Sequence, residues 1–204
     1  MTNGILALWN DCLPGHEEKY EAWYRDEHLP ERLSIPGFVR GRRWRAEGHS
    51  PEYFTYYEVT EPSVLTSEAY LDRLNHPTPA TKDVMSGSFQ NMSRTICQVS
   101  RRAGHLYGSF AFSVLLEAPA KQPILDLLAA VPGVARVESW AAASTEYPPT
   151  REEQLRGGDN RIDACLLVET ITNDATEPAL DALTKIGLIA GRVTVYRFLC
   201  EMTD

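Results

Sequence analysis

The chain has 204 residues, of which 43% are hydrophobic and 24% are charged, a balance typical of a globular protein that buries a sizeable core. Its formal charge of -8 and pI near 5.2 exclude the clustered basic surface that nucleic-acid binding requires. The sequence has no apolar run long enough to span a membrane and no basic export signal at its start, so we expect no membrane association and a cytoplasmic location.

The four cysteines lie far apart in the sequence and form no C-x-x-C pair. We therefore expect free thiols in a reducing compartment, and buried ones where they fall in apolar strands. They are Cys12, Cys97, Cys165 and Cys200.

The first half of the chain reads, in order, as strand, helix, strand, strand, helix and strand. Apolar runs predict the strands, and Pro and Gly mark the ends of the helices. We expect strands over 4–10, 40–44, 53–60 and 93–99, a helix that begins after Pro14-Gly15, and helices from about Pro62 with a bend at Pro77 and Pro79.

The second half repeats this order of elements. We expect strands over 106–116, 134–140, 163–170 and 192–199, a helix between the first two of them, and a helix from about Ala175. The connection over 144–160 is far longer than its first-half counterpart over 46–51. Connections beyond about a dozen residues are uncommon unless they are lids, binding loops or disordered segments. We expect this one to cover a pocket or an oligomer contact, with Tyr147 as its residue of interest.

One segment occurs twice. IPGFVRGRRW over 35–44 aligns without gaps on VPGVARVESW over 131–140, and the two share Pro, Gly, Arg and Trp. The offset is close to half the chain, and the surrounding elements match in type. The sequence therefore predicts two βαββαβ repeats, one over 1–103 and the other over 104–204.

A βαββαβ unit forms a ferredoxin-like antiparallel sheet with both helices on one face, so its other face must be covered. Strands such as FAFSVLL and ACLLV are apolar on both faces in places, which favours two sheets packed face to face. We predict an α+β fold in which the antiparallel sheets of two tandem ferredoxin-like repeats pack together as an α/β barrel. Association of two such chains into a homodimer is left open.

The segment WYRDEHLPERLSIPGF over 23–38 combines aromatic and charged residues. Its helix places Trp23, Tyr24 and His28 along neighbouring rows of one face. Because Pro30 cannot donate a backbone hydrogen bond, the helix should kink or end near His28. The helix dipole and the nearby acids would then favour a protonated imidazole.

The repeat supplies an internal control for this segment. At the repeat offset, His28 and Arg32 correspond to Ile124 and Leu128. The fold therefore requires neither His28 nor Arg32, which favours a functional role for them. The alternative is a solvated helix end that carries charged residues.

The segment ALWNDCLPGHEEKYEAWYRDEHLPERLSIPGF, followed by RGRRW and YFTYYEV, resembles the EthD-like group of the dimeric α/β-barrel superfamily. In that group a first-helix Trp or Tyr precedes a His, and a Pro-Gly turn follows. The resemblance is best over residues 5–100, and the second half shares only the architecture and the Pro-Gly turn. It implies paired ferredoxin-like sheets with a small, mostly apolar pocket between sheet and helices. Relatives include lactone isomerases, polyketide cyclases, cofactor-free monooxygenases and haem peroxidases, so the fold transfers better than the chemistry.

A cofactor-free isomerase or cyclase needs an acid or base near the substrate and a donor for the developing oxyanion. His28 is the candidate for the catalytic acid or base. The candidates for substrate binding are Trp23, Tyr24, Arg32, Arg42 and Tyr57. Arg42 and Arg43 point to opposite faces of a strand, so at most one of them faces a given pocket and we expect the other to face solvent.

We expect no metal and no cofactor. The five histidines show no H-x-H or H-x-x-x-H spacing, no cysteine pair supports a metal site, and no histidine has a recognisable axial setting for haem. The adjacent glycines of LRGGDNR over 155–161 lack the strand-to-helix context of a nucleotide-binding loop. For His76, at the bend before Pro77, we favour a surface kink over an approach to His28.

Two classes of function fit these residues, and the sequence leaves open whether the protein is an enzyme. The first is a cofactor-free isomerase, cyclase or monooxygenase that acts on a carbonyl, lactone or aromatic compound. The second is a non-catalytic small-ligand-binding or stress-associated protein of the same fold. Both imply a small apolar or anionic molecule as partner. A polar pocket with His28 and a second converging donor favours the enzyme, and an apolar pocket with His28 salt-bridged outside it favours the binding protein.

Overall fold

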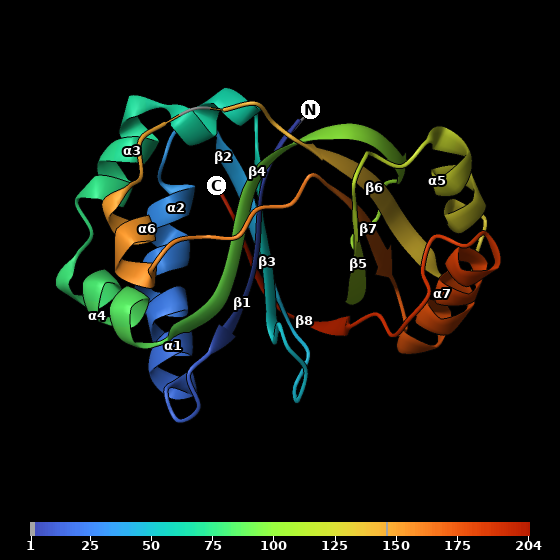
Figure 1. Ribbon diagram of the computed structural model, residues 1–204, viewed down its shortest axis with the longest axis horizontal. Helices are drawn as coiled ribbons and strands as arrows, with labels where there is room; N and C mark the ends of the chain where they lie inside the picture. Colours follow the sequence, from blue (N-terminus) through green and yellow to red (C-terminus); the bar gives the residue numbers. More distant parts are fainter. Residues whose placement is uncertain (1–2, 146) are drawn as a thin grey trace.

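The computed structural model describes residues 3–145 and 147–204, which form eight strands and a set of short helices (Figure 1). The strands are β1 Gly4–Cys12, β2 Phe38–Arg45, β3 Tyr53–Val59, β4 Phe89–Gly104, β5 Phe110–Leu116, β6 Val134–Ala142, β7 Ala164–Thr170 and β8 Val195–Thr203. The α-helices are α1 Glu17–Trp23, α2 Leu29–Leu33, α3 Glu68–Asn75, α4 Pro79–Gly87, α5 Gln122–Ala129, α6 Arg151–Arg156 and α7 Thr176–Lys185. A π-helical turn spans Tyr24–His28, and 3-10 turns span Pro62–Thr66 and Asn173–Ala175. Within the described ranges, no helix has the length and apolar character needed to cross a bilayer.

The strands close into one antiparallel barrel in the order β1-β3-β2-β8-β5-β7-β6-β4. Each half has the strand order of a ferredoxin-like sheet, β4-β1-β3-β2 and β8-β5-β7-β6. The pairs β2–β8 and β4–β6 join the halves along their edges. The inner faces of the two sheets pack on one another in the barrel interior, as predicted. The predicted α+β fold with an α/β barrel formed by one chain is confirmed, and the boundary between residues 103 and 104 stays a prediction.

The repeated Pro-Gly segment has the same geometry in both halves. Gly37 and Gly133 have positive φ angles of 95° and 86°, which glycine adopts without steric cost. Each glycine precedes a strand whose register shifts soon after the start, between Phe38 and Arg40 in β2 and between Val134 and Arg136 in β6. The sequence repeat therefore encodes a turn and a β-bulge.

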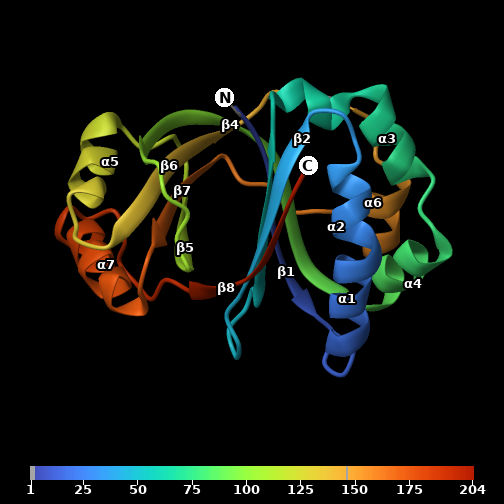
Figure 2. The same cartoon turned by 180° about the vertical axis from the view of Figure 1, so that it is seen from behind.

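The helices cover the outside of the barrel in two groups that lie on opposite sides in both views (Figures 1 and 2). The first group, α1 to α4, covers the first-half sheet, and the second group, α5 and α7, covers the second-half sheet. Helix α6 belongs to the second half in sequence, yet it lies among the first-half helices and packs on α3 and α4. The long connection between β6 and β7 therefore crosses to the first half.

Strand β1 shows how side chains alternate between two cores. Leu6 and Leu8 join the core between the first-half sheet and its helices, whereas Ile5, Ala7 and Trp9 join the barrel interior. A third core lies between the second-half sheet and its helices. Because both of its faces are covered, β1 is buried at every position, which explains its lack of a polar face.

The helical backbone continues past His28 into α2, so the predicted helix end near His28 is wrong, and the alternative of a kink there stays a prediction. The backbone N–H of Leu29 bonds to the Tyr24 carbonyl, five residues earlier, and closes the π-helical turn. Pro30 occupies the first turn of α2, where its missing N–H is tolerated. The π turn thus absorbs the proline, and such turns recur at functional sites.

Candidate functional site

A small cavity of about 20 Å³, here called the helix–sheet cavity, lies between the first-half sheet and its helices. A cavity of this volume holds about one water molecule. Four of the six predicted site residues border it, namely Tyr24, His28, Arg32 and Tyr57. The other lining residues are Leu6, Leu8, Tyr70, Leu74, Met85, Phe89, Met92, Arg94, Glu152 and Arg156. A small, mostly apolar pocket between sheet and helices is therefore present as expected, and it also has charged side chains in its lining.

The helix segment beside the cavity approaches the sheet closely at Gly41 of β2. A Cβ atom at Gly41 would lie 2.9 Å from Leu29 Cδ2 and 2.9 Å from Tyr57 Cε1, closer than real side chains allow. The equivalent position in the second half is the buried Val137. Gly41 therefore lets Leu29, and with it the adjacent His28, lie against the sheet near Tyr57.

His28 lies in an aromatic cage beside the cavity. Its ring centroid is 4.1 Å from that of Trp23, 5.1 Å from that of Tyr24 and 6.5 Å from that of Tyr57. The side chain is 4% exposed, and its Nδ1 has no hydrogen-bond partner among the described residues. Trp23 supports His28 from behind and is itself fixed, because its Nε1 donates to Thr81 Oγ1 at 3.0 Å. The cage orients the imidazole without occupying Nδ1.

The imidazole of His28 is uncharged, which corrects the prediction of a protonated ring at a helix end. Burial, followed by the positive charges of Arg32, Arg156 and Arg43, lowers the pKa of His28 well below its ordinary value. The acids expected to favour the charge bond elsewhere: Asp26 accepts from Arg25, Glu27 from Thr78 and Thr81, and Glu31 from Arg32.

Arg32 is held at the cavity by a carboxylate from the long connection. Its Nη2 donates to Glu152 Oε1 of α6 at 2.6 Å, and its Nη1 donates to Glu31 Oε2 at 3.0 Å. Arg156, one turn further along α6, lies 3.7 Å from Glu152 and 2.7 Å from Asp159. Helix α6 of the long connection therefore covers the cavity, which is one of the two roles that the sequence suggested for this connection.

Arg94 of β4 is a cavity residue that the sequence interpretation missed. Its Nη2 donates to the Tyr70 hydroxyl at 2.9 Å and its Nη1 donates to the Tyr147 hydroxyl at 2.5 Å. Its side chain is buried, and no carboxylate lies within ion-pair distance in the part of the chain that is described. The alternation Met92, Arg94, Ile96 along a predicted strand was the available signal, because all three join the helix-facing side.

Arg43, and not Arg42, points from β2 toward these helices. Its guanidinium lies 3.6 Å above the Tyr24 ring, and its Nη1 donates to Glu21 Oε2 at 2.6 Å. Arg42 points to the barrel interior, so the structure does not bring it to the helix–sheet cavity. Both arginines are buried, and the expectation that one of them faces solvent is wrong.

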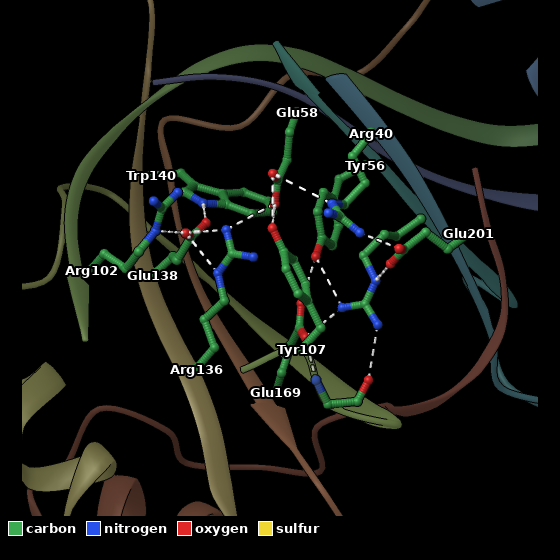
Figure 3. A network of polar contacts seen from close by, with 12 residues as sticks. Arg40, Tyr56, Glu58, Arg102, Tyr107, Arg136, Glu138, Trp140, Glu169 and Glu201 are labelled. Carbon is green, nitrogen blue, oxygen red and sulfur yellow. Dashed lines mark hydrogen bonds and ion pairs between the residues drawn. The ribbon is translucent and has the colours of Figure 1, made fainter. Parts of the chain in front are cut away.

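Arg42 belongs to an ionic network inside one end of the barrel. Figure 3 shows this network, with Glu169, Glu58 and Arg136 among its labelled members. Its Nη1 donates to Glu169 Oε2 of β7 at 2.6 Å, and the Tyr56 hydroxyl donates to Glu169 Oε1 at 2.6 Å. In the same network, Arg136 Nη2 donates to Glu58 Oε1 at 2.9 Å. Each of the two arginine–glutamate pairs joins an arginine of one half to a glutamate of the other. The network therefore fastens the two halves together.

Tyr107, in the link between the halves, closes this end of the barrel (Figure 3). Its hydroxyl donates to Glu58 at 3.0 Å. The guanidinium groups of Arg40, Arg42 and Arg136 lie 4.3, 4.7 and 4.5 Å from its ring centroid. The described cations and carboxylates of this end thus contact one another, which indicates a structural role.

The second half has an apolar core where the first half has the helix–sheet cavity. Ile124 and Leu128, the counterparts of His28 and Arg32, pack with Val168 and Leu183 in the core of that half. The polar side chains His28 and Arg32 are therefore specific to the first half, and the fold does not require them. Among the described residues, no three His, Cys, Asp or Glu side chains gather closely enough to hold a metal ion.

Chemically, the helix–sheet cavity combines an uncharged base with a guanidinium, that of Arg94, whose described hydrogen bonds are to tyrosine hydroxyls. A neutral imidazole with a free nitrogen can accept a proton. The guanidinium of Arg94, bonded only to tyrosine hydroxyls in the contacts above, can stabilise an anion that forms beside it. The Tyr57 hydroxyl, which is buried without a described hydrogen-bond partner, supplies a further donor. This set fits the removal of a proton from a weak acid.

No profile of a known protein family matches the sequence, and no curated protein matches it. Solved structures do match the fold. The chain aligns with an anthrone oxidase-like protein at a TM-score of 0.64 and 13% identity, covering 99% of this chain and 93% of that one. A monooxygenase-like protein from Fusobacterium nucleatum gives a TM-score of 0.58 at 12% identity, covering 100% and 95%.

A mutant chlorite dismutase from Candidatus Nitrospira defluvii gives a TM-score of 0.56 at 9% identity, covering 98% of this chain and 92% of that one. Identities this low show the fold and not the activity. The chain therefore shares the dimeric α/β-barrel architecture of these proteins. The resemblance to the EthD-like group stays a prediction.

Proposed function

We propose that the protein is a cofactor-independent enzyme of the monooxygenase or isomerase type that removes a proton from a phenolic or carbonyl compound. The observation that supports this most directly is the pairing, across one cavity, of the neutral His28 with Arg94, whose guanidinium donates to tyrosine hydroxyls and to no described carboxylate. His28 would be the base, through the free lone pair of Nδ1. Arg94 and Tyr57 would stabilise the oxyanion that results.

The name of one structural neighbour suggests a first substrate class. Anthrone, the compound in the name of the anthrone oxidase-like protein, carries an acidic C–H group opposite a carbonyl. Loss of that proton to His28 gives an anion whose charge rests largely on oxygen, where an arginine stabilises it. The anion can then react with O₂: one anthrone and one O₂ give one anthraquinone and one water. No further oxidant is required.

A substrate of this size enters only if the helix–sheet cavity opens, because its volume is about 20 Å³ in this structure. Helix α6 is the element to move, since it supplies Glu152 and Arg156 to the cavity wall. Gly157 and Gly158, with φ angles of 84° and 100°, follow α6 and give the segment a hinge. Opening would break the bond between Arg32 and Glu152 and free a second guanidinium for the substrate.

The test uses anthrone in aerobic buffer with the purified protein. Oxygen uptake and the absorbance of anthraquinone would be followed for the wild type, for His28→Phe, and for His49→Gln as control at an exposed histidine. Phe keeps an aromatic ring in the cage and removes the base. We expect His28→Phe to lower the rate by roughly 10² to 10⁴-fold, the usual contribution of a general base, and His49→Gln to react as the wild type does.

A His28→Phe variant that oxidises anthrone at the wild-type rate would contradict the assignment of His28 as base. Binding of anthrone without oxygen uptake by the wild type would instead favour the non-catalytic binding protein. A small-molecule partner, a homodimer and a cytoplasmic location stay predictions.

A further inference from the structure

A second hollow, of about 480 Å³, lies at the end of the barrel opposite the ionic network and is here called the barrel-mouth pocket. Strand register places it there. Trp9 pairs with Phe54 near one end of the β1–β3 ladder, whereas Gly4 pairs with Val59, next to Glu58, at the other. The volume lies within the range of roughly 300 to 1,000 Å³ that is usual for small-molecule sites.

The pocket exists because the barrel is closed incompletely between β5 and β8. Strand β5 pairs with β7 over Phe110–Leu116, but with β8 only from Phe110 to Phe112. Strand β8 begins at Val195, and residues 188–194 before it form no strand and diverge from β5. The second part of β5 therefore borders a hollow and not a neighbouring strand.

One wall of the pocket is apolar and fixed. Trp9 is 4% exposed, stacks on Phe54 with centroids 5.0 Å apart, and donates from Nε1 to Ser113 Oγ of β5 at 3.1 Å. Tyr196 is held by a bond from its hydroxyl to the Pro51 carbonyl at 3.0 Å. The ring contact and hydrogen bonds of Trp9 and Tyr196 hold both side chains in place. The wall therefore needs no rearrangement to accept a flat ligand.

The rim of the pocket carries uncompensated positive charge. Arg161 and Arg192 line it and are exposed, and neither has a hydrogen bond or ion pair with any residue that the structure describes. No Asp or Glu is among the lining residues, although the chain as a whole has a net charge of -8. Two arginines without a described partner beside an apolar wall can attract an anion, although the protein as a whole is acidic.

We propose that the barrel-mouth pocket binds a small aromatic carboxylate, with its ring against Trp9 and Tyr196 and its carboxylate on Arg161 and Arg192. Guanidinium groups bind carboxylates through two parallel hydrogen bonds, which supplies orientation as well as affinity. The apolar wall supplies the buried area that a carboxylate alone lacks.

This pocket is separate from the helix–sheet cavity, although both border β4. Successive residues of β4 point to opposite faces, so Asn91 and Ser93 line the barrel-mouth pocket whereas Met92 and Arg94 line the cavity. His28 does not contribute to the barrel-mouth pocket. Binding there is therefore independent of the proposed catalytic activity.

The probe for the test is 2-naphthoate, with its neutral analogue 2-naphthamide, and binding is measured by isothermal titration calorimetry. The variants are the double change Arg161→Gln and Arg192→Gln, the single change Arg151→Gln as matched control, and His28→Phe. Arg151 is exposed on α6, has no side-chain partner in the described part of the chain, and lies outside the pocket. All three arginines are on the surface, so the fold should persist, and thermal unfolding checks this.

We expect 2-naphthoate to bind the wild type roughly tenfold more tightly than 2-naphthamide does, because only the carboxylate engages the guanidinium groups. The double variant should lose that tenfold preference, while Arg151→Gln and His28→Phe should keep it. The proposal is overturned if naphthoate does not bind at millimolar concentration, if the double variant keeps the preference, or if His28→Phe abolishes binding, which would place the ligand in the helix–sheet cavity.

Discussion

Replacing His28 with Phe should change how the stability of the protein depends on pH. In the unfolded chain the imidazole titrates near its ordinary pKa of about 6.5. In the folded protein, burial and the charges of Arg32, Arg156 and Arg43 hold the pKa well below that value. Between these two pKa values the unfolded state binds a proton that the folded state does not bind. Wild-type stability therefore falls as the pH drops below 6.5, and this contribution is constant above it.

The size of this change in the free energy of unfolding follows from the single proton that His28 binds in the unfolded state. Each pH unit in that window costs up to about 1.4 kcal/mol, so acidification from pH 6.5 to 5.0 costs up to about 2 kcal/mol through His28 alone. For a chain of 204 residues this corresponds to a fall in Tm of roughly 4 to 8 °C. His28→Phe removes this proton linkage. Its loss of stability over the same range should be smaller than that of the wild type by this amount.

The measurement is urea unfolding at pH 5.0 to 8.0, followed by circular dichroism, for the wild type, His28→Phe and His49→Gln. The difference between wild type and His28→Phe isolates one group, because all other titrating residues are shared. The control, His49→Gln, removes an exposed histidine from the turn between β2 and β3 and leaves His28 in place. Parallel curves for wild type and His28→Phe would show that folding does not lower the pKa of His28, and would refute the lowered pKa on which the neutral base rests.

Two further predictions concern the barrel itself. Arg42→Met removes the arginine that lies 2.6 Å from the buried Glu169, and it should lower the free energy of unfolding by roughly 3 to 5 kcal/mol. The surface change Arg151→Met should lower it by less than about 0.5 kcal/mol. Urea unfolding of the two variants measures the difference. A thiol reagent at pH 8 should leave Cys97 and Cys165 unlabelled until denaturant is added, because burial raises the pKa of Cys97 to about 12 and that of Cys165 well above its usual value; mass spectrometry of the native protein tests this.

The sequence predicted the fold because the information for it is repeated. Two Pro-Gly segments, each before a strand, identified the halves, and in the structure Gly37 and Gly133 adopt the same left-handed conformation. Free cysteines were also predicted and are confirmed, with three of them buried. Of the helix residues that spacing placed on one face, Tyr24 and His28 border the cavity and Trp23 does not. These are local patterns, which sequence periodicity reports well.

The remainder of the candidate site depends on contacts that sequence periodicity does not report. Glu152 reaches Arg32 only because the connection between β6 and β7 crosses to the first-half helices, 120 residues away in sequence. The alternation of side chains along β2 places Arg42 and Arg43 on opposite faces of the sheet, but it does not say which face meets the helices. The charge of His28 was mistaken because a helix end was inferred from Pro30, whereas a π turn keeps the helix intact and the ring buried. Burial then decides the protonation state.

The two halves differ in a way that a single chain permits. Glu58 and Glu169 each precede the last residue of an equivalent strand, β3 or β7, and each pairs with an arginine of the other half. These reciprocal bonds, together with the strand pairs β2–β8 and β4–β6, hold the barrel closed whatever fills the space between each sheet and its helices. The second half fills that space with Ile124, Leu128 and other apolar side chains, which gain stability from burial. The first half is therefore free to keep a buried imidazole with an unpaired nitrogen, a costly group that a stable partner half can offset.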